Sequence, residues 1–218
     1  MVEKIINSHK GIIFLNGSLD KKILSFINMK VPLIAADGAS EKMKDLGIEP
    51  TCIIGDGDSN KNTKDPFIKI SDQNTTDFEK CISYAKSRDL NTCLVLGMNG
   101  GEIDHVLGNA EVMLKHSDDV SLYFLDAYYK NNKIGVKLGI PISKKLSLVL
   151  KNRCTLSFVS FNDAYIKTKG LFWELSSVFK LSGILPLRNI NVSDFVEIDV
   201  QGKALAIIDI SDLFENLK

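Results

Sequence analysis

Four aspartates in this sequence stand at spacings that suit metal and phosphate chemistry. Asp56 and Asp58 alternate with glycine in Gly-Asp-Gly-Asp-Ser at residues 55–59. In extended chain, side chains two residues apart point the same way, and two neighbouring carboxylates are costly unless a cation lies between them. Mg²⁺ takes hard oxygen ligands of this kind together with substrate phosphates. The segment also fits a plain polar turn in which Asp58 or Ser59 bonds the local backbone, so this motif alone leaves both interpretations open.

The third aspartate, Asp77, stands at the start of a predicted helix. Thr76 begins a Thr-x-x-Glu pattern that ends at Glu79, which is typical of a capping box at a helix N-terminus. In the alternative, functional interpretation the exposed helix amides bind phosphate. Asp77 would then join a metal ion, and Lys80 would neutralise charge.

The fourth aspartate follows a glycine-rich segment, Gly-Met-Asn-Gly-Gly at residues 97–101. A loop of this kind either cradles phosphate or simply turns the chain. Asp104 and His105 come next, either as a helix cap and first turn or as a polar pair aimed into a cleft. No Gly-Lys-Ser or Gly-Lys-Thr follows any glycine loop, which excludes a P-loop kinase, and residues 55–60 lack the third glycine of a dinucleotide fingerprint.

The elements that must position these residues alternate between strand and helix in the first half. Apolar runs predict strands over residues 11–15, 31–36, 52–54, 67–70, 94–96 and 120–125, and helical spacing predicts helices over residues 23–27, 39–46, 76–87 and 105–116. Short apolar strands between helices imply a parallel sheet covered on both faces, which binds ligands beyond the carboxyl ends of its strands. Those ends carry Asp37 and Gly38, residues 55–58 and residues 97–104.

The second half has a different character. Strand-like segments, several of them alternating apolar and polar residues, occupy residues 146–150, 155–159, 165–168, 195–200 and 204–208. They predict a smaller all-β domain, a sandwich or a barrel. We therefore expect an α/β domain over residues 1–126 and a β-sandwich-like domain over residues 127–218, with the boundary within residues 126–142.

Composition narrows the class further. The 218 residues are 44% hydrophobic and 25% charged, which excludes a disordered chain. The 27 basic and 27 acidic residues balance, which disfavours non-specific nucleic-acid binding. Cys52, Cys81 and Cys93 lie in apolar stretches and are expected to be buried thiols, as suits a reducing cytoplasm. No apolar run approaches the length of a membrane span or a signal peptide.

Taken together, the motifs resemble those of the thiamine pyrophosphokinase family. Order and spacing match across about residues 30–115, through Ala-Asp-Gly-Ala (36–39), Leu-Gly-Ile-Glu-Pro (46–50), Ile-Gly-Asp-Gly-Asp-Ser (54–59), Asp-Gln-Asn-Thr-Thr-Asp-Phe-Glu-Lys (72–80) and Gly-x-x-Gly-Gly-x-x-Asp-His (97–105). Two later segments look like the family's C-terminal half, namely Leu-Ser-Leu (146–148) and Gly-Leu-Phe-Trp-Glu-Leu (170–175).

The resemblance implies an α/β nucleotide-binding domain, a β-sandwich and a homodimer. It implies transfer of the terminal pyrophosphate of ATP to the hydroxyl of thiamine, giving thiamine diphosphate and AMP. By resemblance, Asp56, Asp58 and Asp77 hold Mg²⁺, and Asp104 belongs to the same catalytic cleft. The implied ATP-binding residues are Asp37, Gly38, Ser59, Thr76, Lys80, Gly100, Gly101, His105 and Asn109. The implied thiamine pocket, formed across the dimer, has Trp173 as a wall, with Arg188 and Asn189 nearby.

Two positions depart from the family pattern. Glu102 stands where the family usually has an arginine, which reverses the charge beside the phosphates. Arg188-Asn189 stands where the family has Ser-Asn. Two alternatives follow: a pyrophosphokinase of the same fold that acts on another heteroaromatic alcohol, such as a pterin-like one, or a non-catalytic nucleotide- or thiamine-binding protein.

Overall fold

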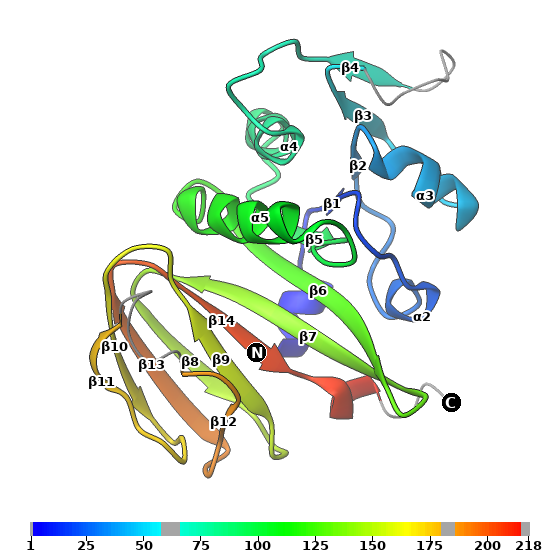
Figure 1. The fold of residues 1–218 in the computed structure, drawn as a ribbon. Coiled ribbons are helices and arrows are strands. Elements are labelled where there is room, and N and C mark those ends of the chain that lie inside the picture. Colours follow the sequence, from blue (N-terminus) through cyan, green and yellow to red (C-terminus); the bar gives the residue numbers. More distant parts are fainter. Residues whose placement is uncertain (1, 58–65, 180–185, 215–218) are drawn as a thin grey trace.

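The computed structural model describes residues 2–57, 66–179 and 186–214 (Figure 1). Strands and helices alternate through the first half, as expected. In chain order these elements are α1 (Val2–Asn7), β1 (Gly11–Phe14), α2 (Lys21–Leu24), β2 (Leu33–Ala36), α3 (Ala39–Asp45), β3 (Cys52–Gly55), β4 (Phe67–Lys69), α4 (Asp77–Ser87), β5 (Thr92–Leu96), α5 (Ile103–Lys115) and β6 (Ser121–Lys130).

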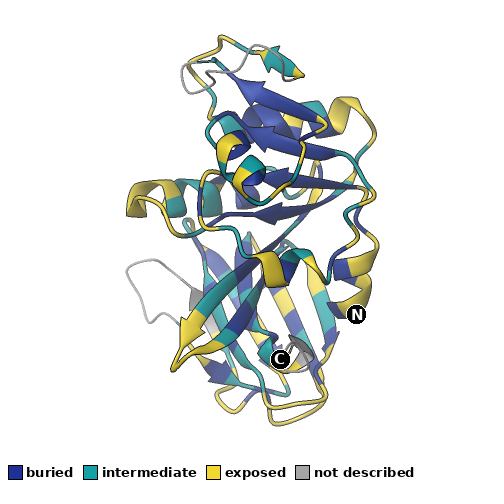
Figure 2. Cartoon of the chain, turned by 90° about the vertical axis from the view of Figure 1, so that its right-hand side faces the viewer, coloured by how far each residue is buried: buried dark blue, intermediate teal, exposed yellow. Residues whose placement is uncertain are grey.

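A parallel sheet forms the centre of this half. Its strands lie in the order β4-β3-β2-β1-β5-β6, with every neighbouring pair parallel. Apolar side chains from α1, α2 and α3 pack on one face, and those from α4 and α5 pack on the other. The central strands β1, β2, β3 and β5 are buried, while the outer helix faces are exposed (Figure 2). The expectation of a parallel sheet covered on both faces is confirmed, and Cys52, Cys81 and Cys93 are buried free thiols.

The second half is a β-sandwich that shares a sheet with the first. Its elements are β7 (Lys133–Ile142), β8 (Lys145–Val149), β9 (Thr155–Val159), β10 (Ala164–Lys169), β11 (Ser176–Phe179), β12 (Asn189–Ile190), β13 (Phe195–Gln201), β14 (Ala204–Asp209) and the 3₁₀ helix η1 (Ser211–Phe214). Strands β7, β14, β9 and β12 extend the parallel sheet into one of ten described strands, and β11-β10-β13-β8 form a second sheet. Apolar residues of both sheets belong to one core cluster.

Strand β6 joins the two halves. Residues 121–125 pair in parallel with β5, and residues 124–130 pair antiparallel with β7. Residue 126, the expected end of the first domain, therefore lies inside a strand that belongs to both halves.

Strand β7 falls within residues 126–142, where the sequence analysis expected only a boundary. It contains Gly135 and Gly139, and glycine disfavours strands. The structure explains both glycines, because the rings of Tyr128 and Phe124 on β6 occupy the space where their side chains would lie. The two-residue turn between β6 and β7, Asn131 and Asn132, has positive φ at both positions, as a tight hairpin requires.

Helices α4 and α5 are tied together by one buried carboxylate. The Thr76 amide donates to Glu79 Oε2 at 2.9 Å, and the Glu79 amide donates to Thr76 Oγ1 at 3.2 Å, so the predicted capping box is present. Glu79 Oε1 accepts from Lys115 Nζ at 2.8 Å and lies 3.3 Å from His116 Nε2 at the end of α5. Burial alone would raise the pKa of Glu79, but these hydrogen bonds outweigh it and lower the pKa to about 2.

We predict that Glu79→Gln lowers the free energy of unfolding at pH 7 by about 1–3 kcal/mol, because the charge-assisted bonds to the cap, Lys115 and His116 are lost. The folded pKa lies below the usual value of 4.5, so this stabilisation is present above pH 4.5 and is lost as the pH falls towards 2. Urea unfolding at pH 7 and pH 3 measures both. The exposed Glu41→Gln is the control, and equal stability of the two variants at pH 7 would contradict the assignment.

Candidate functional site

The carboxyl ends of four neighbouring strands meet at one edge of the parallel sheet. The chain leaves β1 at residues 16–18 and leaves β5 through the glycine loop, which we define as residues 97–101. The Ser18 amide donates to the Asn99 carbonyl at 2.6 Å. A side chain at Gly17 would overlap the carbonyl oxygens of Gly97 and Asn99, and one at Gly100 would overlap Ser18. The two segments therefore pack backbone against backbone.

The same close packing continues to the next two strands. A Cβ at Gly38 would lie 2.6 Å from Asn16 Nδ2, and a Cβ at Gly55 would lie 2.5 Å from the Cβ of Asp37. Asp37 is only 2% exposed, and its Oδ2 accepts from the Gly57 amide at 3.2 Å. Asp37 thus braces the turn after β3, and Gly38 packs closely against Asn16.

A buried lysine lies among the carboxylates at this edge. Lys80 is 5% exposed, and its Nζ lies 3.0 Å from Asp77 Oδ1 at the start of α4. Burial would lower the pKa of Lys80, but the hydrogen bond to Asp77 and the charges of Asp77, Asp56 and Asp72 outweigh it and raise the pKa. Asp56, at the end of β3, accepts from Gln73 Nε2 at 3.1 Å. The structure therefore gathers Asp56, Asp77 and Lys80 into one charged cluster.

Two predicted site residues, Asp58 and Ser59, lie outside the described residues. Among the residues that are described, no three His, Cys, Asp or Glu side chains form a metal cluster. Mg²⁺ commonly takes only one or two protein carboxylates and completes its shell with water and substrate phosphates. Asp56 and Asp77, whose charges both act on Lys80, fit that donor chemistry.

The glycine loop follows β5, three strands away from β3 along the same edge of the sheet. Gly97 and Gly100 have φ of +77° and +85°, a conformation that strongly favours glycine. Gly101 is exposed with open space around it. Glu102, rather than Asp104, is the N-cap of α5, and its side chain makes no capping bond within the described chain. Exposed backbone amides at a helix N-terminus suit anion binding.

The remaining residues predicted near the loop are solvent-accessible. Asp104 and His105 are exposed in the first turn of α5, and Asp104 Oδ1 accepts from the His105 amide at 2.8 Å. Asn109 is half-buried further along the helix. Thr76 serves as the α4 cap described above, so its hydroxyl is already engaged by the Glu79 amide.

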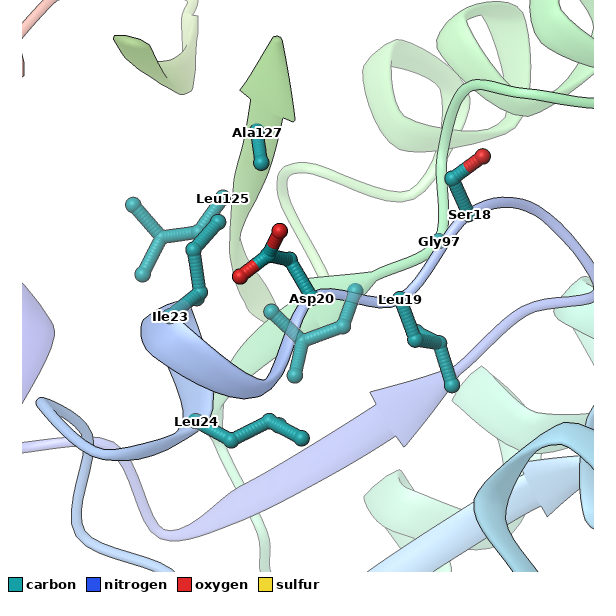
Figure 3. A pocket seen from close by; sticks show the side chains of 9 residues that line it. Ser18, Leu19, Asp20, Ile23, Leu24, Gly97, Leu125 and Ala127 are labelled. Carbon is teal, nitrogen blue, oxygen red and sulfur yellow. The ribbon is translucent and has the colours of Figure 1, made fainter. Parts of the chain in front are cut away.

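An open recess lies where the connections from β1 and β5 leave on opposite faces of the sheet (Figure 3). It is lined by Ser18, Leu19, Asp20, Ile23, Leu24, Leu96, Gly97, Leu125 and Ala127. The order β4-β3-β2-β1-β5-β6 reverses direction between β1 and β5, and open α/β sheets bind their ligands at such a switch point. Recess, glycine loop and charged cluster thus follow one edge.

The three residues predicted to bind thiamine lie far from this edge in the same chain. Asn189 begins β12, at one end of the ten-stranded sheet, whereas β3 and β4 are at the other (Figure 1). Eight strand-to-strand steps separate β12 from β3, about 40 Å at 4.8 Å per step. The structure therefore does not bring Trp173, Arg188 and Asn189 together with Asp56 and Asp77 within one chain.

Asn189 has a local task that the sequence analysis did not foresee. It is 2% exposed; its Oδ1 accepts from the Trp173 amide at 3.1 Å, and its Nδ2 donates to the Trp173 carbonyl at 2.6 Å. It therefore holds the backbone of Trp173, whose side chain is 58% exposed. Arg188 is exposed in a left-handed conformation, with φ of 57°, and donates its amide to Ser157 Oγ at 2.9 Å.

Sequence reasoning missed several residues of the edge. Residues 16–18 are one case, and Lys42, whose Nζ donates to the Asn16 and Gly17 carbonyls at 2.6 and 2.9 Å, is another. The Asn-Gly pair directly after an apolar strand was the available signal. Nothing in the local sequence indicates Lys42, because its partners are backbone atoms about 25 residues away.

The fold is an open α/β sheet continued by a β-sandwich. The carboxyl edge of the parallel sheet carries the charged cluster and the glycine loop. Comparison with known proteins identifies relatives with this architecture. A family model described as "Thiamin pyrophosphokinase, catalytic domain" matches residues 24–124. Thiamine pyrophosphokinase 2 of Arabidopsis thaliana is 26% identical over 186 residues, covering 74% of this chain and 66% of the relative. The chain thus spans just under two thirds of that relative's length.

Solved structures share the whole fold. Thiamin pyrophosphokinase from Candida albicans superimposes with a TM-score of 0.75 at 13% identity, covering 94% of this chain and 90% of the other. The yeast thiamin pyrophosphokinase gives 0.73 at 17% identity, covering 95% and 89%. Residues 24–124 thus match the catalytic-domain model of the thiamine pyrophosphokinase family, and the chain shares the fold of the solved thiamin pyrophosphokinases.

We predict that Gly17→Ala destabilises the protein by about 2 kcal/mol or more, because the added methyl overlaps two backbone carbonyls that cannot rotate away. Gly101→Ala is the matched control: its Cβ meets nothing within 4 Å, so its stability changes by about 0.5 kcal/mol or less. Thermal unfolding measures both variants. Equal melting temperatures for the two would contradict the backbone packing described here.

Proposed function

We propose that this protein transfers pyrophosphate from ATP to the hydroxyl of thiamine, with Mg²⁺, to give thiamine diphosphate and AMP. One observation carries the proposal, namely the buried Lys80 held among Asp56, Asp77 and Asp72 at the carboxyl edge of the sheet. The match of residues 24–124 to the thiamin pyrophosphokinase catalytic-domain model supports this reaction. Phosphoryl-type transfer needs positioning and charge neutralisation rather than a covalent protein intermediate.

In this proposal each residue of the edge has a defined part. Asp56, Asp58 and Asp77 would hold Mg²⁺, which supplies charge neutralisation of the ATP phosphates when bound. Lys80 adds a fixed positive charge beside them, and the Gly100 and Gly101 amides donate to phosphate oxygens. Asp104 and His105 border the same cleft from α5.

The bonds that form and break in pyrophosphate transfer determine how ATP and thiamine must be oriented. The thiamine hydroxyl oxygen attacks the β-phosphorus, and the bond from that phosphorus to the oxygen bridging to the α-phosphorus breaks. AMP leaves with the bridging oxygen, and the hydroxyl proton passes to a base. Attack is in line, so the hydroxyl must approach from the side opposite AMP.

We predict that Asp77→Asn lowers kcat/KM for thiamine diphosphate formation by about 100-fold or more, since a carboxylate that organises the phosphate charge is lost. The exposed Asp45→Asn serves as control and retains activity. The assay quantifies AMP and thiamine diphosphate together from ATP, Mg²⁺ and thiamine. Release of ADP in place of AMP would contradict pyrophosphate transfer, and AMP formed only with a different heteroaromatic alcohol would move the acceptor away from thiamine.

We also propose that the active unit is a homodimer in which thiamine lies between Trp173 of one subunit and the charged cluster of the other. The width of the sheet supports this proposal. Within one chain, eight strand-to-strand steps separate β12, beside Trp173, from β3, beside the charged cluster. An apolar surface around Trp173 gives the dimer something to bury. Phe172 and Trp173 are 59% and 58% exposed and pack edge to face with ring centroids 4.8 Å apart.

Further exposed apolar side chains continue this surface. Phe195 pairs with Val149 across β13 and β8, and both are exposed. Val192, also exposed, donates its amide to the Gly170 carbonyl beside them. A contiguous apolar patch of this kind marks an interaction surface, and the occupant that completes the proposed thiamine pocket is a second copy of the chain.

Subunit complementation tests the shared site. We predict that Asp77→Asn and Trp173→Ala are each nearly inactive alone, and that mixing the unfolded variants in equal amounts and refolding them restores about a quarter of wild-type activity. The recovery arises because half of the dimers are mixed and each mixed dimer holds one intact site. If both residues act within one chain, mixing restores nothing, and that result would contradict the dimer proposal.

A reducing compartment, the cytoplasm, is proposed as well, since all four cysteines are free. Among the described residues, none of the helices is long and apolar enough to cross a membrane.

A further inference from the structure

A buried carboxyl group lies beneath the glycine loop and has no part in the mechanism above. Asp126 follows the parallel portion of β6 and is 6% exposed. Its Oδ1 oxygen is buried without a hydrogen-bond partner among the described residues. An ionisable group buried and only partly bonded is costly, so its position calls for a physical explanation.

The groups that contact Asp126 belong to the glycine loop. Burial raises the pKa of the Asp126 carboxyl to about 7, opposed by hydrogen bonds from the Met98 amide and from the Asn99 side chain and amide. The loop is held from its other side as well, since the Asn99 carbonyl accepts from the Ser18 amide. Asn99 is thus fixed between β1 and β6.

The charged neighbours of Asp126 are otherwise engaged. Lys137 is its register partner on β7, but the Lys137 ammonium lies 2.7 Å from Asp209 on β14. Tyr128, two residues along β6, donates to the same Asp209 carboxylate at 2.7 Å. Beyond the loop, Glu102, Asp104 and His105 are exposed on α5. Lys137 is thus held by Asp209. Asp126 itself lies next to the glycine loop, because Leu125 on β6 pairs with Leu96, the last residue of β5.

We propose that Asp126 is a positioning residue for nucleotide binding: its carboxylate holds the Met98–Asn99 backbone so that the Gly100 and Gly101 amides face the ATP phosphates. The inference rests on the proposed function for the identity of the ligand. In this proposal the backbone amides of residues 98 and 99 point towards Asp126. The amides of Gly100 and Gly101 then remain available to bind an external anion. Gly100, in its left-handed conformation, reverses the chain between the two pairs.

The ionised carboxylate accepts these bonds better than the neutral acid does. Protonation therefore loosens the loop, and the affinity for Mg-ATP rises as the pH increases through about 7. In Asp126→Asn this rise in affinity with pH disappears, because the side-chain amide does not ionise. The amide also has one acceptor oxygen, whereas the carboxylate has two. A step that comes from the ATP phosphates remains in both proteins.

The experiment measures Mg-ATP binding by calorimetry and steady-state kinetics from pH 6 to pH 8, for the wild type and Asp126→Asn. At pH 8 we expect Kd and KM for ATP to rise about tenfold in the variant, roughly one charge-assisted hydrogen bond, with kcat within about threefold. Asp209→Asn is the matched control, since it removes a charged hydrogen bond two strands away. It is expected to lower stability without changing the ATP affinity or its pH dependence.

The possible outcomes separate the two proposals. Equal ATP affinity and equal pH profiles for wild type and Asp126→Asn would overturn the positioning role, as would a loss of affinity in Asp209→Asn of the same size. Wild-type protein that binds Mg-ATP but forms no thiamine diphosphate would defeat the proposed function and leave the loop test intact. Wild-type protein that does not bind Mg-ATP would overturn both.

Discussion

The site depends on the close packing that glycines allow between successive turns at the carboxyl edge of the sheet. Gly17, Gly38, Gly55, Gly97 and Gly100 let the segments after β1, β2, β3 and β5 approach more closely than any side chain would allow. Gly17 and Gly97 meet backbone atoms, whereas Gly38 and Gly55 meet the side chains of Asn16 and Asp37. This constraint sets Asp37 under the turn after β3 and sets the glycine loop against residues 16–18.

Charge balance is the second determinant. Asp56, Asp77 and Asp72 would repel one another at this edge, and Lys80 offsets that repulsion from a buried position. Phosphates and a divalent cation add charges of both signs to the same place, which suits an edge that already holds both. Glu102 at the N-cap of α5 adds a negative charge where the family usually has arginine. The buried Lys80 supplies a positive charge at the same edge.

Much of this organisation could be predicted from the sequence, since it is local. Apolar runs located the parallel strands, the Thr76–Glu79 spacing gave the capping box, and the motifs placed Asp56 and Asp77 at strand and helix ends. Non-local features escaped prediction. Strand β7 contains glycines whose reason is the rings of β6, Lys42 bonds distant backbone carbonyls, and Asn189 clamps Trp173 across a turn. The role proposed for Asp126 could not be predicted, because in the sequence this residue resembles an ordinary polar residue at the end of a strand.

The proposed reaction requires one arrangement of the substrates. The ATP phosphates lie between the charged cluster and the glycine loop, and thiamine is held by the second subunit. A crystal structure with Mg²⁺, thiamine and an α,β-methylene analogue of ATP, in which the bond to be broken is replaced, observes it directly. We expect the β- and γ-phosphates beside Lys80 and the Gly100 and Gly101 amides, with thiamine against Trp173 of the partner subunit. Nucleotide bound away from this edge, or thiamine held within a single chain, would contradict the account.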